Sequence, residues 1–248
     1  MTKPAIHILG DEPALHRASA ERVVQLAAAS VHARGSFHLS LAGGRTPEGL
    51  YATLATPEFA GRMDWSCTHV YFGDERVVPP DHPDSNYRMA RERLLSHVPL
   101  PEGNVHRIAG EQPAAQAAAD YAAVLARSVP LDQGMPRFDL VLLGLGLDGH
   151  IASLFPDTTA LTSTDTSVIP VYVEKLQAWR VSLTYPVLDR ARHLILLVAG
   201  AKKADVVRRA LHEIVGPAPL PVQRLRPQGA VEWFLDAQAA AGLRESPV

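Results

Sequence analysis

The sequence predicts an α/β protein, a single domain in which a mainly parallel, open sheet carries helices on both faces. Segments with strand-like and helix-like patterns alternate along the chain, as in sheets built from β-α-β units. The run at 140–143, Leu-Val-Leu-Leu, has no polar residue, which is typical of a strand covered by helices on both sides. A chain of 248 residues with 47% hydrophobic content can fold around one large core. We therefore expect a modified Rossmann-like domain over residues 1–248.

Hydrophobic periodicity and turn residues place the elements of the first half. An alanine-rich segment with apolar residues spaced near 3.6 predicts a helix at 12–33, ended by Gly35. Thr46 is a suitable N-cap, with Pro47 at the first position, for a helix that continues to about Ala55. Further helices are expected at 87–97 and 113–128, and strands at 5–9, 37–42, 68–72 and 138–143.

The second half continues the alternation in less regular segments. A Thr/Ser-rich surface loop at 158–167 precedes an apolar run at 168–173. Strands are expected at 181–183 and 193–198, and a helix at 201–214. A rigid connection follows, and Trp233-Phe234-Leu235 then begins a terminal segment that packs onto the rest. The prolines of that connection are Pro217, Pro219, Pro221 and Pro227.

Composition excludes several classes of protein. With 24 basic and 26 acidic residues the net charge is −2, and the cations are scattered, so we expect no nucleic-acid surface and no membrane patch. No apolar run is long enough to span a bilayer, and the N-terminus lacks the apolar segment of a signal peptide. The single cysteine, Cys67, rules out an internal disulfide and fits a reducing compartment. We therefore expect a cytoplasmic protein.

The most informative segment is the loop Gly144-Leu145-Gly146-Leu147-Asp148-Gly149-His150. It follows the buried run at 140–143, and open parallel sheets bind their ligands beyond the carboxyl ends of the strands. The carboxylate of Asp148 and the imidazole of His150 stand two residues apart on a glycine-rich loop, which favours acid–base chemistry at neutral pH. The alternative is that His150 is a hydrogen-bonded loop residue without a catalytic role.

The same loop fits the pattern G-x-G-x-x-G, which occurs in dinucleotide sites. Such a site needs a helix directly after the glycines, and here Pro156 and a Thr/Ser-rich stretch follow instead. Glu174 ends the next apolar run, so this alternative stays open. The sequence has no G-K-[ST] pattern, no G-x-S-x-G elbow and no Cys/His cluster at metal spacing. We therefore expect no bound metal.

Other loops that follow strand-like runs carry groups suited to an anion. In Gly43-Gly44-Arg45-Thr46 the glycines allow backbone amides to approach an anion, and the helix start adds partial positive charge. A capped tight turn is the alternative there. Gly73-Asp74-Glu75-Arg76 combines acidic and basic side chains, which are usually solvated on a loop, and only its position after a strand-like run favours a function. Gly200-Ala201-Lys202-Lys203 places two lysines at a helix start, which indicates either a nearby anion or simple exposure. Arg180 is a further candidate cation.

Taken together, these motifs resemble the 6-phosphogluconolactonase family. The resemblance runs nearly end to end and includes Leu-Ala-Gly-Gly at 41–44, Gly-Asp-Glu-Arg-Val-Val-Pro at 73–79, Asp-Ser-Asn-Tyr at 84–87, the loop at 144–150, Ser-Leu-Phe-Pro at 153–156, Arg-Val-Ser-Leu-Thr at 180–184, and Trp-Phe-Leu at 233–235. The family is similar in fold to glucosamine-6-phosphate deaminases, which share the glycine turn and the Asp-Gly-His loop. The deaminase pattern has a glutamate seven residues after that Asp, where this chain has Phe155.

The resemblance implies hydrolysis of 6-phospho-D-glucono-1,5-lactone to 6-phosphogluconate in the pentose phosphate pathway, with no cofactor. It implies that His150 takes a proton from water, that Asp148 holds the imidazole or the water, and that Arg76 stabilises the oxyanion. Substrate and phosphate binding is expected from Gly43, Gly44, Arg45, Thr46, Asp74, Glu75, Arg180 and Lys203. We expect a monomer or a small homo-oligomer. The alternative is a sugar-phosphate sensor, although the sequence shows no basic helix-turn-helix segment.

Overall fold

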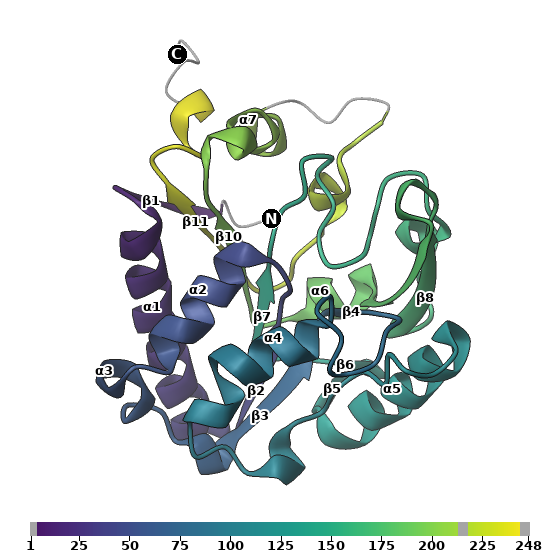
Figure 1. The fold of residues 1–248 in the computed structure, drawn as a ribbon, viewed down its shortest axis with the longest axis horizontal. Helices are drawn as coiled ribbons and strands as arrows, with labels where there is room; N and C mark the ends of the chain where they lie inside the picture. The colour runs from purple at the N-terminus through teal and green to yellow at the C-terminus, as the bar shows by residue number, and fades with distance from the viewer. Residues whose placement is uncertain (1–3, 213–217, 244–248) are drawn as a thin grey trace.

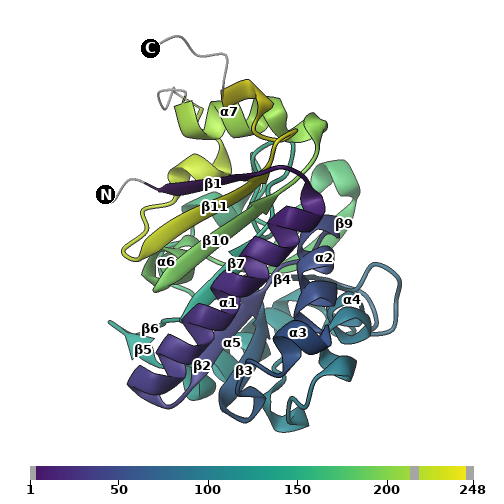
Figure 2. The ribbon, with the colours of Figure 1, turned by 90° about the vertical axis from the view of Figure 1, so that its left-hand side faces the viewer.

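The computed structural model describes residues 4–212 and 218–243. In these ranges a sheet of parallel strands forms the centre of the molecule, as the sequence predicts (Figure 1). From edge to edge the strands are β1 (Ala5–Leu9), β11 (Ala230–Asp236), β10 (His193–Val198), β7 (Leu140–Leu143), β2 (Phe37–Leu41) and β3 (Thr68–Phe72). Figure 2 shows them in this order from top to bottom. Every residue of β7 is buried, which explains its unbroken apolar sequence.

The chain changes its direction of travel across the sheet between β2 and β7. From β2 it moves outward to the edge strand β3, whereas from β7 it moves the other way to β10 and then β11. The loops after β2 and β7 therefore diverge and leave a crevice at the carboxyl edge of the sheet, where such folds bind ligands. The backbone oxygen of Gly43 lies 3.7 Å from the place of a Cβ on Gly144. The strand order thus brings the glycine turn next to the His150 loop.

Helices cover both faces of the central sheet, as predicted (Figures 1 and 2). On one face lie α1 (Glu12–Arg34), α2 (Arg45–Leu54) and α3 (Pro57–Ala60), and beyond the other lie α5 (Ala114–Ser128) and α6 (Tyr185–Arg190). Asp11 is the N-cap of α1, and its carboxylate accepts a hydrogen bond from the amide of Ala14. Gly35 is the C-cap and ends the helix, as predicted. α4 (Asn86–Arg93) packs beside α2, and α7 (Ala204–His212) lies near the C-terminal end of the described chain.

Short 3-10 helices occupy several connections. They are η1 (Trp65–Cys67), η2 (Leu95–His97), η3 (Glu102–Asn104), η4 (Thr159–Thr162), η5 (Glu174–Leu176), η6 (Ala201–Lys203), η7 (Pro221–Arg224) and η8 (Ala241–Leu243). Two of them matter for the site. η5 forms the turn of a hairpin that overhangs the crevice, and η6 begins the segment after β10.

A second, antiparallel sheet stands beside the carboxyl edge of the first. It contains β4 (Asp74–Arg76), β9 (Ala178–Leu183) and β8 (Val168–Val173) in that order, and α5 packs against β8 and β9. The segment at 74–76, expected as a loop, is therefore a strand. A small hairpin, β5 (Leu131–Asp132) with β6 (Met135–Pro136), completes the strands of the described ranges.

Several local predictions differ from the structure. Thr46 is not the N-cap of α2, because the helix begins two residues earlier than predicted, at Arg45, with Gly44 as its N-cap. The helix predicted at 87–97 ends at Arg93 and continues only as η2. Trp233-Phe234-Leu235 does not begin a terminal segment but lies inside β11, between β1 and β10. The predicted helix at 201–214 becomes η6 followed by α7, and its last two positions and Pro217 lie outside the described residues.

One cluster of buried apolar side chains joins the two larger sheets and the helices around them, and it includes Val141 of β7 and Val181 of β9. In the described part of the chain no helix is both long and apolar enough to cross a membrane.

Candidate active site

A cavity of about 630 Å³ opens at the carboxyl edge of the central sheet. It is bounded by the loops after β2, β7 and β10 and by residues of β4, β9 and η5. Most of the predicted site residues line it, namely Gly43, Gly44, Arg45, Thr46, Asp74, Arg76, His150, Arg180 and Lys203. Asp148 stands behind His150 rather than on the cavity wall, and Glu75 points elsewhere.

The His150 imidazole is fixed by two neighbours. Its Nδ1 lies 2.5 Å from Oδ1 of Asp148, and its ring stacks on Phe155 with 4.0 Å between ring centroids. Burial alone raises the pKa of Asp148, but hydrogen bonds from His150 and Lys175 outweigh that effect and hold the pKa below its ordinary value. An ionised Asp148 accepts the proton of Nδ1, so Nε2 is left to act as a base.

Gly146 is necessary for this arrangement. A Cβ at this position would lie 1.9 Å from Nδ1 of His150 and 2.6 Å from Oδ1 of Asp148. The amide of Gly146 also donates a hydrogen bond to the carbonyl of His150 at 2.8 Å, which closes the loop on itself. The glycine pattern that resembles a dinucleotide motif is thus explained by the packing of the two acid–base side chains. The Thr/Ser-rich stretch after the loop forms η4 rather than a long helix.

The glycine turn at 43–44 is shaped for close approach. A Cβ on Gly43 would lie 2.1 Å from Oδ1 of Asn86, so a side chain is excluded there. Beneath the turn, the hydroxyl of Tyr51 accepts a hydrogen bond from the amide of Ala42 and donates one to its carbonyl. Gly44, with φ of 102°, precedes the first turn of α2. The N-terminus of α2 therefore faces the cavity, where its partial positive charge favours an anion.

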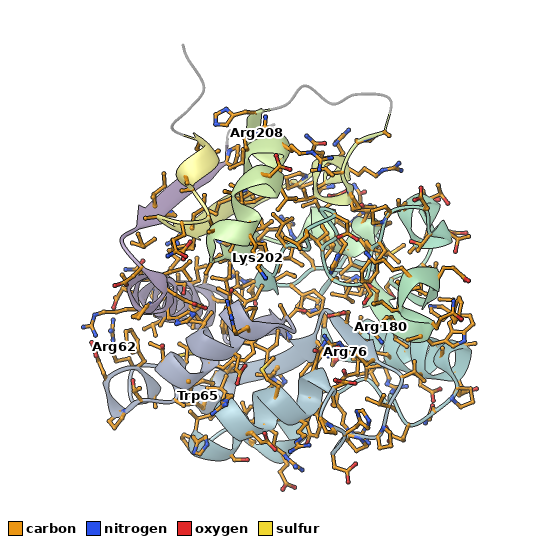
Figure 3. The ribbon with its side chains drawn as sticks, turned by 45° about the horizontal axis from the view of Figure 1, so that its top comes forward. Arg62, Trp65, Arg76, Arg180, Lys202 and Arg208 are labelled. Atoms are coloured by element: carbon orange, nitrogen blue, oxygen red, sulfur yellow. The ribbon has the colours of Figure 1, made fainter. Side chains whose placement is uncertain are left out.

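Arg76 and Arg180 come from adjacent strands of the second sheet. They are directly opposite each other in the register of β4 and β9, and Figure 3 shows them side by side. Like charges in this position destabilise a sheet. Burial and the nearby Arg76 lower the pKa of Arg180. Two guanidinium groups held together at a cavity wall are therefore suited to an anionic ligand.

Lys203 adds a third cation to the cavity. Its ammonium donates a hydrogen bond to the carbonyl of Leu145, in the loop after β7. Burial lowers the pKa of Lys203, and the charge of Asp148 opposes that effect. The lysine thus ties η6 to the His150 loop while its charge stays at the cavity.

The two acidic residues of β4 differ in position. Asp74 lines the cavity, and its carboxylate accepts hydrogen bonds from Ser153 at 2.6 Å and from Asn86 at 3.1 Å. Glu75 is buried, and its carboxylate accepts hydrogen bonds from the amides of Asn86 and Tyr87. It therefore caps α4, and its position does not support the expected contact with substrate. Burial raises the pKa of Glu75, and these amides oppose the rise.

Lys175 is a site residue that sequence reasoning missed. Its ammonium donates a hydrogen bond to Oδ2 of Asp148, and the residue lines the cavity from η5. The hairpin of β8 and β9 brings it there from a distant part of the sequence, so no local spacing marks it. In the described ranges no group of three or more His, Cys, Asp or Glu side chains is arranged to bind a metal ion.

Comparisons with known proteins point to one family. The family model described as glucosamine-6-phosphate isomerases/6-phosphogluconolactonase matches residues 10–233. A 6-phosphogluconolactonase of Synechocystis is 43% identical over 85% of this chain and 86% of its own length. One from Nostoc is 36% identical over 97% of this chain and 99% of its own.

Solved structures give the same picture. The 6-phosphogluconolactonase of Trypanosoma brucei superposes with a TM-score of 0.89 at 33% identity and covers 98% of this chain and 100% of its own. A monomeric glucosamine-6-phosphate deaminase superposes with a TM-score of 0.80 at 19% identity, over 96% of this chain and 99% of its own. The second likeness shows a shared fold only.

Proposed function

Since the chain belongs to the family of glucosamine-6-phosphate isomerases and 6-phosphogluconolactonases, we propose that it hydrolyses 6-phospho-D-glucono-1,5-lactone to 6-phosphogluconate. The observation that carries the proposal is one cavity whose wall includes several cations and His150, the imidazole of which is paired with Asp148 behind it. A base is needed to activate water, and cations are needed for the phosphate and for the charge that develops on the lactone.

In the proposed mechanism His150 is the general base. Its Nε2 takes a proton from water, and the resulting hydroxide adds to the carbonyl carbon of the lactone. Arg76 stabilises the tetrahedral oxyanion. When that intermediate collapses, the bond between the carbonyl carbon and the ring oxygen breaks, and the imidazolium returns its proton to the ring oxygen. Asp148 keeps the ring oriented and stabilises the imidazolium.

The remaining cations and amides hold the phosphate. The backbone of Gly43 and Gly44, with Arg45 and Thr46, forms one wall, and Arg180 and Lys203 form the other. Because the phosphate does not react, these contacts position the lactone ring against His150. Asp74 faces the same cavity and is suited to accept hydrogen bonds from sugar hydroxyls.

Phe155 argues against the deaminase activity within the same family. It stacks on His150, at the position where the deaminase pattern has a glutamate. A phenyl ring neither donates nor accepts a proton, so the acid–base group needed for ring opening is missing. The ring instead shields the imidazole from bulk water, which strengthens electrostatic interactions at the site.

The proposal is tested with freshly generated phosphorylated lactone in a coupled assay that detects 6-phosphogluconate, after subtraction of spontaneous hydrolysis. We expect wild-type activity and a loss of about 100-fold or more in kcat for His150→Ala, with an unchanged thermal unfolding transition. Unphosphorylated gluconolactone should be a poor substrate. Absence of catalysis by the wild type, or binding of phosphosugars without turnover, would instead support a sensor.

A further inference from the structure

The carboxylate of Asp148 has two partners, one for each oxygen. Oδ1 lies 2.5 Å from Nδ1 of His150, and Oδ2 accepts a hydrogen bond from the ammonium of Lys175. His150 belongs to the same loop as Asp148, whereas Lys175 comes from η5. The lysine therefore fixes the orientation of the carboxylate from the opposite side to the imidazole.

Phe155 completes a closed set of contacts around these groups. The ammonium of Lys175 lies 4.7 Å from the centroid of the Phe155 ring, a distance at which a cation is attracted to an aromatic ring. The same ring stacks on the imidazole of His150. Lys175 thus contacts both neighbours of the imidazole, Asp148 and Phe155.

The segment that carries Lys175 is braced. Gln177 takes a left-handed conformation with φ of 46°, and its side-chain amide donates hydrogen bonds to the carbonyl and carboxylate of Glu174. Tyr172 and Trp179 pack against each other across the hairpin, with 5.3 Å between ring centroids. The turn that presents the lysine is therefore held from both sides.

We propose that Lys175 is a positioning residue of this hydrolase, which holds Asp148 in the orientation that His150 needs and offsets part of the negative charge of that carboxylate. The proposal rests on the proposed function, since it assigns His150 as the base. In this mechanism Lys175 contacts neither the attacking water molecule nor the lactone, and it acts through Asp148.

The sign of the effect follows from Coulomb's law. An unshared carboxylate stabilises the imidazolium and raises the pKa of a histidine, and a cation on the other carboxylate oxygen reduces that influence. Removal of the Lys175 charge should therefore make His150 harder to deprotonate. The side chain of Lys175 is half exposed, so solvent and salt weaken the effect of its charge. The other charged groups that face the cavity remain unchanged in the experiment; they are Arg45, Asp74, Arg76, Arg180 and Lys203.

The experiment compares kcat as a function of pH for the wild type, Lys175→Met and Lys175→Arg. Methionine keeps an unbranched stem without the charge, and arginine restores the charge. We expect the rising limb of the Lys175→Met profile to move up by roughly 0.5–1 pH unit, which is a loss of about 3- to 10-fold at pH values below the midpoint. Lys175→Arg should restore most of the wild-type profile.

Lys202→Met is the matched control, because it removes the same charge from an exposed lysine that does not line the cavity. We expect a wild-type profile for it. A lower kcat for Lys175→Met with an unchanged midpoint would make the lysine a purely structural contact and would overturn the proposal. An unchanged kcat and midpoint would overturn it as well.

A second measurement does not depend on turnover. Titration of the His150 imidazole by NMR, with its signal identified by its loss in His150→Gln, should give a higher midpoint in Lys175→Met than in the wild type. If the wild type does not hydrolyse the lactone, the proposed function fails, and this titration still tests the link between Lys175 and His150. An equal midpoint in the two proteins contradicts that link.

Discussion

Gly146→Ala tests the arrangement of the base with a single methyl group. The added Cβ would lie 1.9 Å from Nδ1 of His150 and 2.2 Å from its Cε1, whereas contacts of a real Cβ essentially never fall below 3.0 Å. The imidazole must therefore retreat by about 1 Å or rotate away from Asp148. A displacement of this size in a catalytic group costs on the order of 100-fold in rate, so we expect kcat to fall by about that factor.

The fold should tolerate the same substitution. Gly146 does not have a positive φ, and the overlapping atoms are side-chain atoms of His150 and Asp148 rather than backbone. We expect thermal unfolding within a few degrees of the wild type. Gly10→Ala is the matched control, because a Cβ at Gly10 meets nothing within 4 Å. A Gly146→Ala protein with kcat within about 3-fold of the wild type would refute the placement of His150 against Asp148 as the catalytic arrangement.

Three further predictions concern the cations of the cavity, Phe155 and the buried His38. Arg180→Ala and Lys203→Ala should raise KM far more than they lower kcat, because they grip a phosphate that does not react; a fall confined to kcat in steady-state assays would contradict this. Phe155→Glu should impair lactone hydrolysis by placing a carboxylate near the developing oxyanion, and neither it nor the wild type should release ammonia from glucosamine 6-phosphate in an enzymatic ammonia assay. Burial lowers the pKa of His38 to about 4. In the unfolded chain this residue is protonated below about pH 6.5, whereas in the folded protein it is protonated only below about pH 4. The free energy of unfolding should therefore be highest above pH 6.5 and should fall by on the order of 2 kcal/mol towards pH 4. Measured by urea unfolding at several pH values, it should depend less steeply on pH in His38→Gln than in the wild type; an equal pH dependence would count against the prediction.

The sequence predicts the inner strands β7 and β10 well, because all of β7 and all but the first residue of β10 form continuous apolar runs. β7 is buried throughout, and its pattern needs no knowledge of neighbours. β11 is harder, since Trp233, Phe234 and Leu235 near the end of the chain become a strand only by pairing with β1 and β10. β4 is harder still to predict, because its three residues are all charged and are held extended by their pairing with β9.

The site likewise contains residues that local sequence predicts and residues that only the folded chain brings together. Asp148 and His150 are neighbours in sequence, so their pairing can be expected from local spacing. The partner of Asp148 on the other side, Lys175, reaches it through the β8–β9 hairpin. Glu75 shows the opposite case, since its position after a strand-like run and its match to a family motif predict a ligand contact, whereas the folded chain uses its carboxylate to cap α4. Local patterns predict which groups are available, and long-range pairing decides which of them meet.

The contact of Asn86 with Gly43 has a consequence for attempts to change the specificity of this protein. Asn86 fills the space that a side chain at Gly43 would need, and its amide group also donates hydrogen bonds to the carbonyl and carboxylate of Asp74. One residue at the start of α4 thus packs against both the glycine turn at 43–44 and the strand that carries Arg76. A loop from a relative that replaces the glycine turn at 43–44 would therefore need the start of α4 from the same relative, because the two segments pack directly against each other.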